Sequence, residues 1–149
     1  MKKITLILGF VLFSAFGAFA QLENPVSWAY VAKKTGPNEA TIYLKATIED
    51  SWHIYSQNLK PGGPNKTVFK FTPSKDFTLI GKPIEPKPIT KYEKSFKMDV
   101  AYFENEVVFQ QKIKLNKGTT VVKGKVEFMV CNDTSCLPPS DVTFSIPVK

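Results

Sequence analysis

The sequence predicts an all-β protein built as one domain. Apolar and polar residues alternate with a period of two in several segments, most clearly in 41–48, where Ile42, Leu44, Ala46 and Ile48 share one face. Clusters of Gly, Pro, Asn and Asp separate these segments at short intervals. No stretch shows a sustained helical period. Seven to nine short strands with frequent turns are typical of an immunoglobulin-like β-sandwich.

The individual strands follow from this alternation. We expect them at residues 25–32, 41–48, 52–55, 68–71, 77–80, 107–115, 121–130 and 142–148. Pro83, Pro86 and Pro88 exclude a central strand from the stretch that follows residue 80, because proline cannot donate a ladder hydrogen bond. The sequence therefore predicts an extended surface loop over 82–96, and loops of this length usually have a function or are disordered.

The amino terminus has the pattern of a secretory signal peptide. Lys2 and Lys3 precede an apolar run, 4–13, and Ala18 and Ala20 form a small-x-small cleavage site. A membrane anchor is the alternative, but the run is short for a span and no charged stop follows it. We expect cleavage after residue 20, which leaves 149 − 20 = 129 residues, 21–149, as the exported domain. No other segment is long and apolar enough to enter a membrane, and disulfides persist in the periplasm where we place the protein.

The positive charge does not indicate nucleic-acid binding. The formal net charge is +7, and removing Lys2 and Lys3 leaves 7 − 2 = +5. All basic residues are lysine, whereas arginine provides much of base and phosphate recognition. The lysines are scattered along the strands, as expected for a solvated surface that protects sheet edges.

The two cysteines of the chain, Cys131 and Cys136, flank a short polar segment, 132–135. Alternating apolar residues precede and follow them, so we expect a β-hairpin with one cysteine at each mouth of its turn. Opposed residues in such a hairpin have Cα atoms roughly 4.5–5.5 Å apart, and a disulfide needs roughly 4.4–6.8 Å. The two sulfurs are therefore expected to lie within bonding reach.

The sequence leaves open whether this pair is structural or redox-active. A disulfide that closes a loop of about six residues adds only about 2 kcal/mol in the chain-entropy model, which is little for a staple. A redox pair needs one reachable thiolate and a second thiol nearby. Alternation places Cys131 on the same side as Lys125 and Glu127, so its sulfur is expected near the surface. Asp133 disfavours a neighbouring thiolate, and a strongly lowered thiol pKa is not predicted.

Three segments resemble a known family. Residues 130–139, two cysteines around a polar loop followed by Leu137, Pro138 and Pro139, resemble the active-site segment of the amino-terminal periplasmic domain of DsbD, a transmembrane thiol-disulfide reductant conduit. Residues 50–55 are similar to the family's strand segment with an aromatic-x-Tyr edge. Residues 92–108 are similar to its cap-loop region and the strand after it.

The resemblance implies an immunoglobulin-like sandwich with the cysteines at one end, beneath a cap loop. Residues 94–98 match that loop, and Phe96 matches the aromatic residue that shields the disulfide. His53 and Tyr55 match aromatic positions that border the site. Ordinary packing is the alternative for each of these three side chains. The cysteine spacing differs from the enterobacterial form, since the loop here is one residue shorter.

The expected function is that of a periplasmic thiol-disulfide oxidoreductase, which needs no cofactor. Cys131 and Cys136 would pass reducing equivalents to thioredoxin-like proteins. Since the expected domain has no membrane segments, the electrons would come from a separate membrane donor of DsbD type.

Two other classes of function remain open at this stage. The first is a non-enzymatic β-sandwich binding module with the cysteine pair as a static clip. The second is a carrier of copper or another soft metal, for which His53, Met98, Met129 and the two cysteines are suitable ligand types.

Overall fold

The computed structural model describes residues 24–149, which contain eleven strands and no helix. No helix in this part of the chain is therefore long and apolar enough to span a membrane. The expected signal peptide, 1–20, lies outside the described residues, and the domain boundary at residue 21 stays a prediction. The strands are β1 (Val26–Gly36), β2 (Glu39–Ile48), β3 (His53–Tyr55), β4 (Val68–Phe71), β5 (Phe77–Ile84), β6 (Ile89–Glu93), β7 (Met98–Phe103), β8 (Glu106–Leu115), β9 (Thr120–Phe128), β10 (Val130–Cys131) and β11 (Ser140–Val148).

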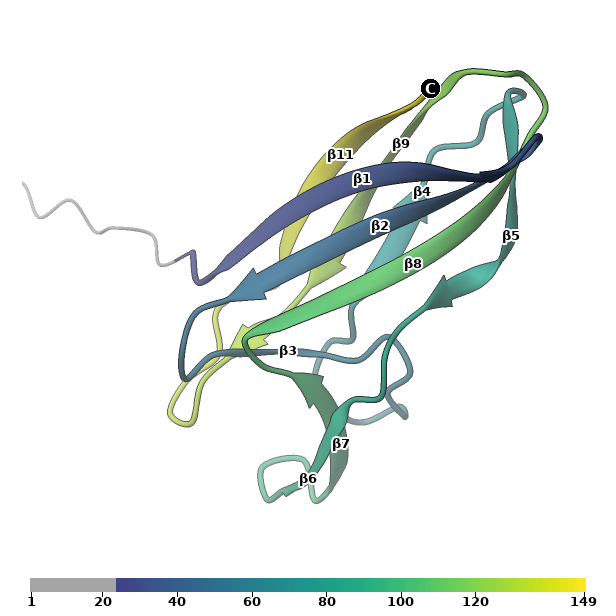
Figure 1. Cartoon of the computed structure of the whole chain (residues 1–149). Helices are drawn as coiled ribbons and strands as arrows, with labels where there is room; N and C mark the ends of the chain where they lie inside the picture. Colours follow the sequence, from purple (N-terminus) through teal and green to yellow (C-terminus); the bar gives the residue numbers. More distant parts are fainter. Residues whose placement is uncertain (1–23) are drawn as a thin grey trace, which may run out of the picture.

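Two antiparallel sheets form the body of the molecule. One has the order β1-β2-β8-β5 and the other β11-β9-β4, and Figure 1 shows them as two facing layers. Their inner faces carry the alternating apolar residues, as the pattern of 41–48 predicted: Ile42, Leu44 and Ala46 are fully buried. The prediction of an all-β, immunoglobulin-like sandwich is confirmed.

Aromatic rings join the two layers. The Trp28 ring on β1 lies 6.1 Å from Phe69 on β4 and 5.5 Å from Phe128 on β9, measured between ring centroids. Phe69 in turn lies 4.9 Å from Phe109 on β8. Burial of rings this large contributes much of the stability of a core of this size, and offset or edge geometry adds to it.

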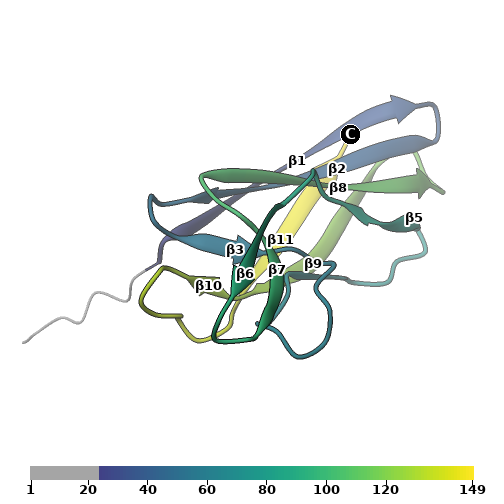
Figure 2. The same ribbon diagram turned by 90° about the horizontal axis from the view of Figure 1, so that it is seen from below.

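A third sheet, of order β10-β3-β7-β6, closes one end of the sandwich (Figure 2). β10 belongs to this sheet because the strand expected to run from 121 to 130 divides at Met129. Its first part, β9, pairs with β4 and β11, whereas β10 pairs with β3. The residues that lead into the first cysteine thus leave one sheet and join another.

The prediction of an extended loop over 82–96 is wrong. β5 continues to Ile84, and β6 pairs in register with β7, so that residues 89–103 form a hairpin that we call the cap hairpin. β5 and β6 are edge strands of their sheets. An edge strand tolerates a proline such as Pro83, because its outer side has no neighbouring strand to which a backbone N–H would donate. The three short strands β6, β7 and β10 also explain why eleven strands are present rather than seven to nine.

The connector between β5 and β6 is held by a carboxylate. Glu85 accepts hydrogen bonds from the Ser56 hydroxyl, from the Gln57 backbone N–H (3.0 Å) and from the Asn58 side-chain amide (2.7 Å). The Gln57 side-chain amide donates to the carbonyl oxygen of Pro83 at 2.7 Å. These bonds tie the base of the cap hairpin to the loop that follows β3.

Candidate functional site

Cys131 and Cys136 form a disulfide at the end of the sandwich, with an S–S distance of 2.03 Å. The two residues are paired as an antiparallel β-bridge, and the Leu137 N–H donates to the Val130 carbonyl oxygen at 3.0 Å. The expected hairpin with a cysteine at each mouth is confirmed. The Cα atoms are 4.0 Å apart, slightly less than the roughly 4.5 Å of ordinary non-hydrogen-bonded pairs.

Asn132 organises the loop between the cysteines. Its side-chain oxygen accepts from the backbone N–H groups of Thr134 (2.9 Å) and Ser135 (2.8 Å), and its own N–H donates to the Ser135 carbonyl oxygen at 2.9 Å. Asparagine side chains that bond to the following backbone in this way stabilise turns. The loop therefore returns the chain to Cys136 in a defined conformation.

The two cysteines differ in exposure. Cys131 is 2% exposed and belongs to a small buried cluster with Tyr55 and Val100, whereas Cys136 is exposed. The prediction that Cys131 lies near the surface is wrong. The alternation itself continues through Met129, since Val130 lies in the main core and Cys131 on the opposite side of the strand, as expected. That side is not open to solvent, because Tyr55, Val100 and the cap hairpin cover it.

Phe96 lies in the turn 94–97 of the cap hairpin and packs against the cluster that contains Cys131. The Phe96 N–H donates to the Glu93 carbonyl oxygen at 3.2 Å, and Lys97 adopts a left-handed conformation with φ of 53°. The Phe96 side chain is half-buried. It therefore occupies a position from which it can cover the buried sulfur.

His53 and Tyr55 lie on β3 on the same face as Cys131. His53 is the direct cross-strand partner of Cys131, and Tyr55 is the partner of Tyr102 on β7. The imidazole Nε2 lies 3.2 Å from the Tyr55 hydroxyl. Ring centroids of His53 and Tyr102 are 4.9 Å apart. The structure thus brings both residues to the disulfide.

Burial dominates the acid–base behaviour of these side chains. It raises the pKa of Tyr55 to about 12, with a smaller contribution from Glu93, so this hydroxyl stays protonated. Burial also lowers the pKa of His53, against an opposing effect of the nearby carboxylates, of which Glu104 is the strongest. The pKa of Tyr102 is raised mainly by burial.

A cavity of about 310 Å³ opens between the cap hairpin and the cysteine loop. Lys91, Glu93 and Asp133 bring charge to its wall, and the remaining lining residues are His53, Tyr55, Ser95, Phe96, Cys131, Asn132, Thr134, Ser135 and Cys136. Sequence reasoning missed Lys91, Glu93 and Tyr102. Counting every second residue in 89–93 and 98–102 would have placed these three side chains on one face of a hairpin. The prolines before residue 89 argue against a strand there, so the sequence alone predicts a loop.

Two methionines, which are soft metal ligands, lie near the buried cluster of Cys131, Tyr55 and Val100. Met98 and Met129 pack against the group that contains Cys131, whose sulfur is bonded to Cys136. Among residues 24–149, no three His, Cys, Asp or Glu side chains are grouped in a way that suits a metal ion.

Comparison with known proteins gives relatives of the same fold. The crystal structure of the reduced Neisseria meningitidis DsbD N-terminal domain is 21% identical, covers 79% of this chain and 84% of its own, and has a TM-score of 0.51. The N-terminal periplasmic domain of ScsB from Proteus mirabilis is 17% identical over 83% of this chain and 46% of its own, with a TM-score of 0.61.

A third structure is the complex between the DsbD N-terminal and PilB N-terminal domains from Neisseria meningitidis. The match is 17% identical, covers 84% of this chain and 87% of its own, and has a TM-score of 0.55. At these identities the likeness shows the fold. A search of curated proteins found no match. The model of the family described as "Thiol:disulfide interchange protein DsbD, N-terminal" matches residues 24–147. With nearly every described residue inside that match and a disulfide at the end of the sandwich, the chain belongs to the family of DsbD N-terminal domains.

Proposed function

We propose that this protein is a thiol-disulfide oxidoreductase that transfers two electrons through Cys131 and Cys136. The observation that carries the proposal is a disulfide between a buried cysteine residue, Cys131, and an exposed one, Cys136, at the wall of a cavity. A purely structural disulfide gains nothing from an exposed cysteine. Thiol-disulfide exchange, in contrast, requires that a partner thiolate attack one of the two sulfurs in line.

The difference in exposure assigns a role to each cysteine. Cys136 exchanges with the partner, since its side chain is accessible, and Cys131 resolves the mixed disulfide. In the reducing direction, the Cys136 thiolate attacks the partner disulfide and releases one partner thiolate. Cys131 then attacks the Cys136 sulfur, closes the internal disulfide and releases the second partner thiolate, so two electrons pass to the partner.

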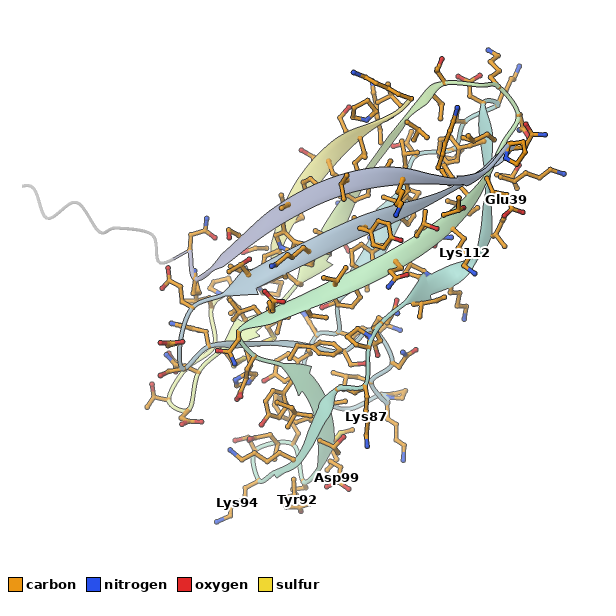
Figure 3. All side chains as sticks on the ribbon, in the orientation of Figure 1. Glu39, Lys87, Tyr92, Lys94, Asp99 and Lys112 are labelled. Atoms are coloured by element: carbon orange, nitrogen blue, oxygen red, sulfur yellow. A yellow bond between two sulfur atoms is a disulfide. The ribbon has the colours of Figure 1, made fainter. Side chains whose placement is uncertain are left out.

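The cap hairpin controls access to this pair. Phe96 covers the buried cluster, and His53 and Tyr55 form the wall beside it. Displacement of the turn 94–97 would open the cavity to a partner, while the closed position slows attack by small reductants and oxidants. Tyr92 and Lys94 project from the cap hairpin away from the sandwich (Figure 3), where an approaching partner can contact them.

The partners are proteins of thioredoxin fold in the periplasm, and the electrons come from a separate membrane donor of DsbD type. Support comes from family membership and from the signal-peptide pattern of residues 1–20. The complex of the meningococcal DsbD and PilB N-terminal domains, and the periplasmic description of the ScsB domain, are consistent with this assignment.

Trapping of the mixed disulfide tests the proposal. Reduced Cys131→Ser and Cys136→Ser variants are mixed with a thioredoxin-fold protein whose exposed cysteine carries an activated thionitrobenzoate and whose second cysteine is replaced. The Cys131→Ser variant should form a stable adduct through Cys136, and the Cys136→Ser variant should react far more slowly. Equal failure of both variants to form an adduct would refute the proposed exchange.

A further inference from the structure

The single histidine of the chain lies beside the buried sulfur. His53 on β3 and Cys131 on β10 are direct cross-strand partners, and such partners have Cβ atoms roughly 4.5–5.5 Å apart on one face of the sheet. Both residues line the same cavity. The imidazole is thus the titratable group that the sheet register places opposite this sulfur.

The imidazole is held in orientation by its neighbours. Its Nε2 lies 3.2 Å from the Tyr55 hydroxyl, the two rings meet edge to face with centroids 5.2 Å apart, and the Tyr102 ring lies 4.9 Å away on another side. In the tautomer in which Nε2 carries the hydrogen, this N–H donates to the Tyr55 oxygen, and Nδ1 keeps a free lone pair.

Cys131 meets a difficulty that Cys136 does not. Only the thiolate attacks a disulfide, and burial in apolar surroundings raises the pKa of a thiol. Cys131 is 2% exposed, packed with Val100, Tyr55, Phe96 and the two methionines 98 and 129, so water reaches its sulfur poorly. Each turnover must nevertheless remove a proton from this sulfur in one direction and return it in the other.

We propose that His53 exchanges this proton with Cys131; the inference rests on the proposed function. When Cys131 attacks the Cys136–partner disulfide, Nδ1 of His53 takes the proton from the Cys131 thiol as the new S–S bond forms. The electron pair of the broken bond leaves with the partner thiolate. When an incoming thiolate attacks Cys136 instead, Cys131 leaves with the electron pair and takes the proton back from the imidazolium.

The surroundings of His53 suit this role. Burial keeps the imidazole neutral near neutral pH, ready to act as a base. The charged groups that face it come from several elements: Glu104 follows β7, Glu93 and Lys91 lie on β6, and Asp133 lies in the cysteine loop. The three carboxylates stabilise the imidazolium that forms, whereas Lys91 opposes it, so both protonation states remain accessible.

Single-turnover kinetics test the proposal. Reduced wild-type protein and the variants His53→Phe and His53→Gln are mixed with excess glutathione disulfide between about pH 5.5 and 9.5. Acid quenching and mass spectrometry then give the rate at which Cys131 resolves the Cys136–glutathione adduct. Phe keeps a ring beside Tyr102, and Gln keeps a polar group, so together they separate packing from proton transfer.

We expect the wild-type resolution rate to stay nearly constant from about pH 9 down to about pH 6.5. The variants should lose about tenfold in rate per pH unit wherever the Cys131 thiol is protonated, because only the thiolate attacks. At about pH 6.5 they should be about 10- to 100-fold slower than the wild type, and the curves should converge at high pH. Added imidazole should restore a His53→Ala variant at about pH 6.5.

The proposal is overturned if the variants keep the wild-type pH profile, or if they are slower by one factor at every pH and imidazole does not restore His53→Ala. The second result would show a packing role. The failure of the proposed function looks different: reduced Cys131→Ser protein would then form no adduct with the activated thioredoxin-fold protein.

Discussion

Phe96, in the turn of the cap hairpin, packs against the same buried cluster as Cys131 on β10. β10 is one edge strand of the third sheet, and Phe96 lies in the turn that joins β6, the other edge strand, to β7. The turn of the cap hairpin thus packs over the cluster that contains the disulfide. The contact links the conformation of one hairpin to the accessibility of one sulfur. Such a link is what a redox site needs if it is to react with chosen partners and not with every thiol around it.

Replacement of Phe96 by alanine should speed the reduction of the disulfide by dithiothreitol by roughly threefold or more, because exchange rates depend on access to the sulfur. Stopped-flow measurement of thiol release checks this. Tyr92→Ala is the matched control, since this side chain on the same hairpin is 56% exposed and points away from the sandwich. Equal rates for wild type and Phe96→Ala would show that Phe96 does not shield the pair.

Asn132→Ala should weaken the closure of the cysteine loop. The substitution removes the side-chain oxygen that accepts from Thr134 and Ser135, and each such bond is worth about 1 kcal/mol. Since the loop then holds the thiols together less well, the reduction potential of the pair should rise. Asn132→Asp keeps an acceptor oxygen and should shift the potential less. Redox titration with alkylation distinguishes the variants, and a lower potential in Asn132→Ala would contradict this account of the loop.

Gly124→Ala should destabilise the sandwich. A Cβ at this position of β9 would lie 2.5 Å from the Lys70 carbonyl oxygen and 2.6 Å from Cζ of Phe144, so backbone and ring must move. Overpacking of this kind costs about 1–3 kcal/mol. Gly118→Ala is the control, because a Cβ there would have no neighbouring atom within 4 Å, and it should change stability by less than about 0.5 kcal/mol. Urea unfolding measures the stability of both variants. Equal free energies of unfolding for Gly124→Ala and Gly118→Ala would show that β9 and its neighbours accommodate the added Cβ without cost.

The lowered pKa of His53 predicts a pH dependence of stability. Its unfolded pKa is about 6.5 and its folded pKa is lower, so the unfolded state binds more protons between the two values. The free energy of unfolding should therefore fall as pH decreases through about 6.5 towards the folded pKa. His53→Phe removes this contribution. Urea unfolding of both oxidised proteins at about pH 7.5 and 5 should show a larger loss for the wild type; an equal loss would mean that burial does not depress the pKa of His53.

Local patterns in the sequence were enough to predict the sandwich and the cysteine hairpin. The alternation of Ile42, Leu44 and Ala46 reports burial on one face, and this burial is observed. The polar segment between Cys131 and Cys136 indicates a turn, because Asn and Asp bond to the backbone that follows them.

Features that depend on contacts between distant segments were not predictable in the same way. The shift of the chain from one sheet to another at Met129 is set by pairing with β3. Cys131 lies on the expected side of the strand, but Tyr55, Val100 and the cap hairpin cover that side and bury it. The cap hairpin was missed because Pro86 and Pro88 argue against strands, although they lie just before an edge strand that tolerates them. Register between β3 and β10, not sequence spacing, brings His53 to the sulfur.

The reduction potential of the Cys131–Cys136 pair tests the central claim most directly. Thiol alkylation across a series of dithiol buffers measures this potential. We predict a value in the range of exchange proteins, roughly −120 to −270 mV. A value below about −300 mV would mark a structural clip and contradict the assignment as an oxidoreductase.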